Sequence, residues 1–174
     1  MILRFYPKKD ATIYESAPET NTGMDSILEI SKQADTGAAA SASFNYRILI
    51  DFDYVKISKS IVDMGYDPNE FDFGLKLYST EASEIPLDYN LEAFPISQSW
   101  NMGVGKKGTT PATTEGCSWY YRNGLTDPTT AWKTGSFAPG STGSFEINGG
   151  GATWYTTSQA SESFSYTTTD IDMD

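Results

Sequence analysis

The chain has 174 residues, 39% of them hydrophobic and 14% aromatic, which disfavours intrinsic disorder and allows one domain with a buried core. Twelve basic and 23 acidic residues give a formal net charge of −11, which argues against binding to nucleic acid or to anionic membranes, because both need a basic surface. There is no histidine and one cysteine, so a histidine-based catalytic triad and an internal disulfide are excluded.

The N-terminal part of the chain predicts short strands separated by turns. Its apolar and β-branched runs cover residues 2–6, 11–15 and 26–31. Pro7 ends the first run, and the turn signal Asn21-Thr22-Gly23 precedes the third. The small residues of 34–43 predict a loop.

The strongest strand pattern covers residues 46–53. Its apolar residues Ile48, Ile50 and Phe52 alternate with Arg47, Leu49, Asp51 and Asp53. This period of two predicts a half-buried strand of an antiparallel sheet. We expect Asp51 and Asp53 on its outer face, which is typical of a solvated acidic surface rather than of a glycosidase pair.

The rest of the chain predicts one short helix and further strands. Ile57, Ile61 and Met64 have helical spacing, which predicts a helix over 57–65 that ends at Gly65. Further strands are predicted at 74–80, 88–94, 117–122 and from 163 onward, and loops at 103–116 and 135–151. Eight or nine short strands predict a single all-β domain over 1–174, an antiparallel β-sandwich or jelly roll.

Two motifs need a comparison of functional and structural interpretations. Gly103-Val-Gly105-Lys-Lys-Gly108 matches a dinucleotide-binding fingerprint, but no helical pattern follows it, so we predict an ordinary loop. Cys117 has no imidazole to activate it, and we expect it to be a small buried side chain.

Aromatic and acidic side chains supply the candidate binding residues. Exposed aromatic rings can stack on sugars, which makes a carbohydrate platform conceivable; the alternative is that these rings fill the core. The candidates for sugar binding are Trp100, Trp119, Tyr121 and Trp132. Asp10, Glu15 and Asp53 could join a structural calcium site, because Ca²⁺ takes carboxylate oxygens. No other cofactor is expected.

The order of several short motifs resembles the DNRLRE domain family. The motifs are Asp10–Glu15, Asn21–Gly23, Ile27–Ile30, Arg47–Asp53, Phe73–Tyr78, Ser97–Trp100, Ser118-Trp119 and Thr169–Asp172. The resemblance implies a jelly roll similar to carbohydrate-binding modules, as found in bacterial and archaeal surface proteins and in virion proteins of tailed phages. Two departures stand out: residues 54–72 form a longer connection, and family members continue beyond the position of Asp174. We therefore expect a longer product or a sheet completed by another chain.

Two functions follow as hypotheses, and neither is enzymatic. The first is a structural protein of a bacteriophage virion: a capsid decoration, neck, baseplate or fibre-attachment component that forms homo- or hetero-oligomers with other virion subunits. The absence of a signal peptide in a protein expected to work outside the cell favours this location. The alternative is a carbohydrate-binding module of a bacterial or archaeal surface protein, extracellular and bound to glycans. A hydrolase has only scattered carboxylates to support it.

Overall fold

The computed structural model describes residues 2–34, 43–78, 88–124, 130–132, 150–154, 160–165 and 170–173. The fold is mostly β, with antiparallel strand pairs and one short helix, as the sequence predicts. The chain divides into two compact units: unit 1 is Met1–Phe52 with Ile96–Trp154, and unit 2 is Asp53–Pro95 with Tyr155–Asp174.

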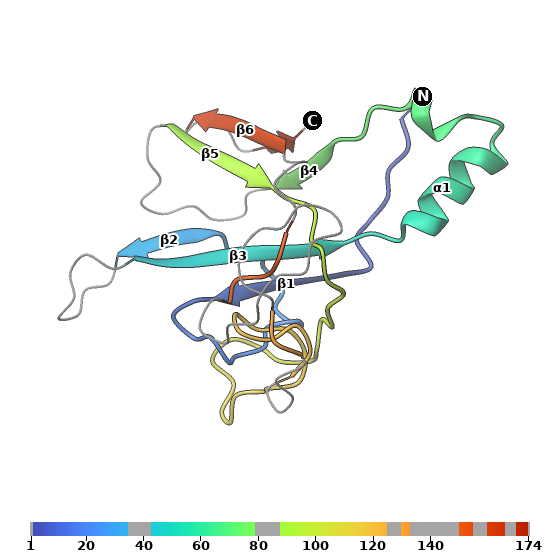
Figure 1. Cartoon of the computed structure of the whole chain (residues 1–174). Helices are drawn as coiled ribbons and strands as arrows, with labels where there is room; N and C mark the ends of the chain where they lie inside the picture. Colours follow the sequence, from blue (N-terminus) through green and yellow to red (C-terminus); the bar gives the residue numbers. More distant parts are fainter. Residues whose placement is uncertain are drawn as a thin grey trace. The chain divides into compact units, whose positions relative to one another are not determined.

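Unit 1 is built on an antiparallel three-stranded sheet. β3 (Ser43–Asp51) lies between β1 (Lys9–Tyr14) and β2 (Ser31–Ala34), as Figure 1 shows. The predictions for 11–15 and 46–53 are confirmed, although each strand begins two or three residues earlier. Of the loop predicted at 34–43, residues 35–42 lie outside the described residues.

The core face of this sheet differs from the prediction. Ala11 pairs directly with Leu49, and both side chains are buried. Because directly paired residues share a face, the pairs Ile13–Arg47 and Lys9–Asp51 lie on the core face as well. The expectation that Asp51 lies on the outer, solvated face is therefore wrong. Its carboxylate forms ion pairs with Lys8 at 3.2 Å and with Lys9 at 3.5 Å. These ion pairs let a charged residue sit at the end of an apolar face.

The opposite face carries a pair of tyrosines in contact. Tyr14 is buried and meets Tyr46 edge to face, with ring centroids 4.8 Å apart. The Lys107 ammonium lies 4.5 Å from the centroid of the Tyr14 ring and forms an ion pair with Glu29 at 2.7 Å. Lys107, a loop residue, thus covers the Tyr14 ring, while Glu29 balances its positive charge.

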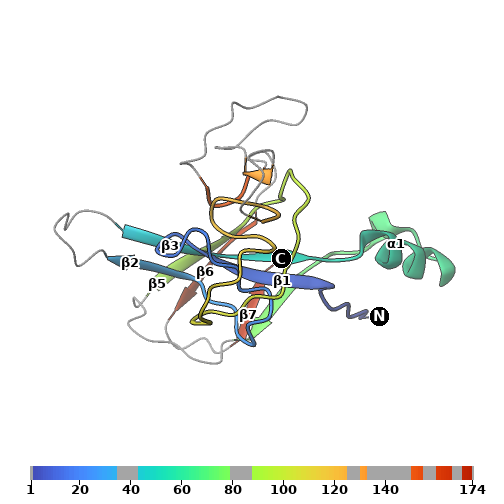
Figure 2. The ribbon, with the colours of Figure 1, turned by 90° about the horizontal axis from the view of Figure 1, so that it is seen from below.

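Irregular segments of residues 96–124 cover the core face of the sheet, and Figure 2 shows them in front of the strands. The predicted loop at 103–116 is confirmed. The predicted strand at 117–122 is wrong, because Ser118 N donates to Tyr121 O at 2.7 Å and turns the backbone. Only an isolated bridge joins Tyr121 to Ala131.

Two further strand predictions in unit 1 fail. Residues 2–6 have the composition of a strand but pair with no described residue. Residues 26–30 are irregular, and the strand begins only at Ser31. The Glu29 N–H donates to the Thr12 hydroxyl at 2.9 Å, so a side chain of β1 takes the place of a ladder partner.

Unit 2 contains the helix α1 (Tyr54–Asp63), which confirms the prediction at 57–65 but begins earlier. The Asp53 carboxylate caps it by accepting the Lys56 N–H at 3.0 Å. Ile61 is buried, as the helical spacing predicts. The helix ends at Asp63, and Gly65, two positions further on, has a φ of 84°, which suits a residue without a Cβ. A 3₁₀ turn, η1 (Pro68–Glu70), follows.

Two antiparallel strand pairs complete unit 2. β4 (Leu75–Tyr78) pairs with β7 (Asp170–Met173), and β5 (Asp88–Ala93) pairs with β6 (Ala160–Ser165). The strand predicted at 88–94 is confirmed, and the strand predicted at 74–80 is confirmed for 75–78, while residues 79 and 80 lie outside the described residues. The strand predicted from 163 onward covers the end of β6 and all of β7, and residues 166–169 between them lie outside the described residues. The loop predicted at 135–151 falls almost entirely outside the described residues.

Candidate functional site

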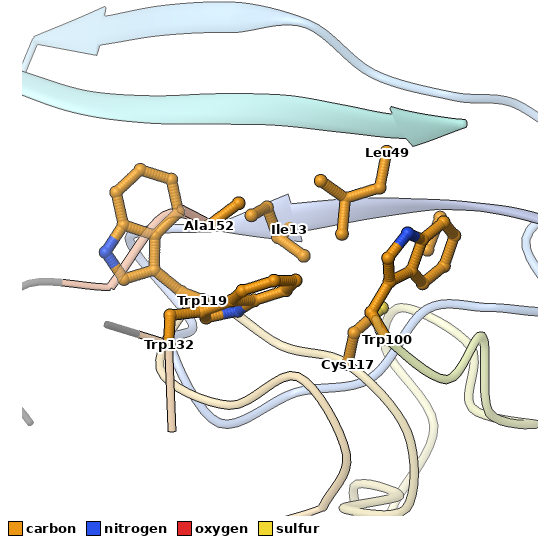
Figure 3. Close-up of a cluster of buried hydrophobic side chains, with 8 residues drawn as sticks. Ile13, Leu49, Trp100, Cys117, Trp119, Trp132 and Ala152 are labelled. Carbon is orange, nitrogen blue, oxygen red and sulfur yellow. The ribbon is translucent and has the colours of Figure 1, made fainter. Parts of the chain in front are cut away.

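The tryptophans considered for sugar binding lie together in the core of unit 1. Trp100 and Trp119 are 8% and 4% exposed, and Trp132 is fully buried. Figure 3 shows them packed with Ile13, Leu49, Cys117 and Ala152. Sugar stacking needs an exposed ring face, which these three indoles do not offer. Tyr121 is half-buried, outside this cluster.

Polar contacts fix the indoles in place. Trp132 Nε1 donates to the Ser118 carbonyl at 2.9 Å. The Lys9 ammonium lies 4.4 Å from the centroid of the Trp100 ring and also donates to the Trp100 carbonyl. Both contacts satisfy groups that would otherwise be costly to bury.

Arg47 lies between two indoles at the other end of the core face. Its guanidinium carbon is 4.9 Å from the Trp119 ring centroid and 4.6 Å from the Trp154 ring centroid. Nη1 donates to the Gly151 carbonyl. Burial lowers the pKa of Arg47, and the negative charge of Glu15 opposes this shift. Arg47 therefore ties β3 to the segment 150–154 by stacking.

Two of the three residues considered for calcium binding, Glu15 and Asp53, have separate structural tasks. Asp10 and Glu15 lie five positions apart along and just beyond β1, about 16 Å in an extended chain. The Glu15 carboxylate accepts the Asn45 backbone N–H at 2.7 Å. Asp53 caps α1. The structure does not bring the three together, and in the described ranges no other group of three cysteine or carboxylate side chains could hold a metal ion.

The glycines of the loop at 103–108 allow it to approach the Asn21 side chain, and no phosphate group is needed to account for them. The buried Asn21 side chain donates to the Met102 and Cys117 carbonyls at 2.7 and 2.8 Å. Its Oδ1 accepts the Gly105 N–H at 2.7 Å. A Cβ at Gly103 or Gly105 would overlap Asn21. These glycines are needed so that the loop can approach an asparagine.

Cys117 is fully buried against the core. Burial raises the pKa of its thiol to about 12. The predicted role as a small buried side chain is confirmed, because thiolate chemistry needs a lowered pKa and access.

The surface that stands out in unit 2 is an exposed face of α1. Val55 is 78% exposed, Tyr54 70% and Val62 55%. Together with Ser58, Lys59 and Asp63, these residues line a shallow groove, which we call the α1 groove. Its lining is mostly apolar, and Lys59 and Asp63 form an ion pair at 2.7 Å at its side.

Sequence reasoning missed the α1 groove because it followed the buried residues of the helix. Val55 and Val62 are seven positions apart and so lie on one helix face, separate from Ile57 and Ile61. A second apolar stripe at this spacing was the available signal.

No protein-family model, curated protein or solved structure matches the chain. Within the described ranges, no helix is both long and apolar enough to cross a lipid bilayer.

Proposed function

We propose that the chain is a non-catalytic structural protein of a bacteriophage virion, which acts through contacts with other virion subunits. The observation that supports this proposal best is the α1 groove. Val55 is 78% exposed, and its apolar side chain makes no favourable interaction with water. A helix face that stays in contact with solvent typically carries polar residues instead.

Burial of the apolar side chains of the α1 groove by a partner would release enough free energy to stabilise a protein–protein contact. Fully burying a valine or similar side chain stabilises by about 1.5–3 kcal/mol. A partner that covers Tyr54, Val55 and Val62 therefore recovers several such increments. Lys59 and Asp63 at its side offer both signs of charge to fix the orientation of the partner.

The DNRLRE resemblance supports the same proposal, since the family occurs in tailed-phage virions. A jelly-roll arrangement of the strands belongs to the proposal on the same ground, and antiparallel strand pairs are compatible with it. The alternative, a glycan-binding surface module, has less support because Trp100, Trp119 and Trp132 are buried.

The experiment compares virion particles assembled in the presence of the wild-type chain with particles assembled in the presence of the double variant Val55→Glu/Val62→Lys. The variant keeps the net charge and places each new charge where the helix dipole favours it, so the helix should remain folded. The matched control is Ala112→Glu/Thr109→Lys in an exposed loop.

Quantitative mass spectrometry of purified particles is the readout. We expect the wild type and the control at a fixed ratio to the major capsid subunit, and the α1 variant depleted by about tenfold or more, which corresponds to about 1.4 kcal/mol of contact energy. A chain that is absent from particles would overturn the proposal.

A further inference from the structure

The segment Ile2–Tyr6 has the sequence of a strand, but it pairs with no strand among the residues that the structure describes. Ile2 and Tyr6 are 84% and 85% exposed, whereas Leu3 and Phe5 are half-buried. Exposure thus alternates with the period of a strand. Figure 1 shows the segment as an extended trace that leads into β1. We call residues 2–6 the arm.

The backbone of the arm is available for pairing. Among the described residues, the first backbone hydrogen bond at this end of the chain is Lys8 N to Asp51 O at 2.9 Å, and none involves the arm. Isoleucine, leucine, phenylalanine and tyrosine favour strands once a partner supplies the ladder. The only charged residue of the arm is Arg4, which suits a partner as acidic as this chain, with its net charge of −11.

An acceptor of matching length is present in the same chain. β2 (Ser31–Ala34) is at the edge of its sheet and pairs with β3 on one side. On its other side no described residue makes a backbone hydrogen bond with it, and Ser31 and Lys32 are exposed. An unpaired strand edge is a template for another strand.

The arm cannot reach the outer edge of its own β2. Lys8 is fixed to Asp51, next to β1, at the opposite edge of the sheet. The outer side of β2 is about three strand spacings from β1, or about 14 Å. Pro7 and Lys8 span at most about 7 Å. A second copy of the chain does not have this restriction.

We propose that the arm of one copy adds as a strand to the outer edge of β2 in a second copy. This inference rests on the proposed function and names the partner of one contact as the chain itself. Each copy has one arm and one β2 edge, so the contact forms a reciprocal dimer, a ring or an open filament.

Sedimentation velocity over a concentration series tests the association. The wild type is expected to self-associate, and the double variant Arg4→Pro/Phe5→Pro to associate at least about tenfold more weakly. Successive N–H groups of a strand point to opposite sides, so one of two consecutive prolines removes a donor to the ladder in either orientation of the arm. Ala112→Pro, in an exposed loop without a described backbone hydrogen bond at its nitrogen, is the matched control.

Disulfide cross-linking locates the contact. A chain with Arg4→Cys is mixed with a chain with Ser31→Cys, while the buried Cys117 stays protected. A mixed disulfide that forms faster than either homodimer supports the inference. A wild type that stays monomeric, or an association that the prolines do not weaken, overturns it. Neither result affects incorporation into particles through the α1 groove, so failure of the inference and failure of the proposed function are distinguishable.

Discussion

The side-chain oxygen of Asn21 accepts the backbone N–H of Gly105 at 2.7 Å, across 84 positions of sequence. The same asparagine holds the carbonyls of Met102 and Cys117. One buried side chain therefore fixes the loop that closes the core of unit 1.

Replacing this asparagine should be costly. Asn21→Ala leaves two carbonyls and two N–H groups, those of Gly105 and Gly23, without the asparagine as their partner. Each unsatisfied buried group costs about 1–3 kcal/mol. We expect a loss of about 3 kcal/mol or more in the free energy of unfolding, measured with urea. Asn69→Ala, where an exposed asparagine bonds Asp67 at the surface, should change it by less than about 0.5 kcal/mol. Equal effects would show that Asn21 does not fix the loop.

Arg47 should stabilise unit 1 through its two indole contacts. Arg47→Met keeps an unbranched side chain but removes the cation between Trp119 and Trp154. Each cation–π contact is worth about 0.5–1 kcal/mol, so we expect a loss of about 1–2 kcal/mol in urea unfolding. Lys106→Met, at an exposed loop position, serves as control. An Arg47 variant as stable as the control would contradict the stacking account.

Because of Cys117, we expect the free energy of unfolding to depend on pH in the alkaline range. Its pKa is raised from 9.0 to about 12 by burial. Below pH 9 the thiol is protonated in both the folded and the unfolded chain, and its contribution is constant. Between pH 9 and 12 only the unfolded chain loses this proton, so the free energy of unfolding falls by about 1.4 kcal/mol per pH unit.

Urea unfolding from below pH 9 to pH 10 measures this slope. The interval ends at the ordinary tyrosine pKa of 10.0, above which the raised pKa of the buried Tyr14 adds a second loss of the same sign. Cys117→Ala should flatten the curve in this interval, at a constant cost for the smaller side chain. A slope that is unchanged in the variant would rule out Cys117 as its source.

The Asp53 carboxylate should set the stability of the start of α1. Asp53→Ala removes the acceptor of the Lys56 N–H, and loss of such a cap costs about 1 kcal/mol. Hydrogen exchange of the first-turn amides of α1 should accelerate about fivefold. Asp53→Ser keeps a capping oxygen and should remain near the wild type; a serine variant that exchanges as fast as the alanine variant would be evidence against the cap.

A short apolar and β-branched run was enough to predict β1, period-two alternation was enough to predict β3, and helical spacing with Gly65 was enough to predict α1. The core face of β3 could not be predicted from polarity, because Lys9 matches the charge of Asp51 and two indoles cover Arg47. Residues 2–6 have a strand-like sequence but form no strand, because a strand needs a partner, which local sequence does not specify.

The candidate sites show the same limit of sequence reasoning. Trp100, Trp119 and Trp132 fit both an exposed platform and a core, and only tertiary packing distinguishes the two. The link between Asn21 and Gly105 joins two segments that the sequence treats as separate turns. The α1 groove had a local signal in the spacing of Val55 and Val62, which could have predicted it.

Chemical labelling of Lys59 tests most directly whether another subunit covers the α1 groove. Its side chain lines the groove and is 70% exposed. An amine-reactive reagent is applied to the isolated chain and to purified particles, with the exposed Lys106 as internal reference. Coverage by a subunit predicts that Lys59 reacts several-fold more slowly in particles while Lys106 does not change. Equal reactivity of Lys59 in both samples would contradict the account.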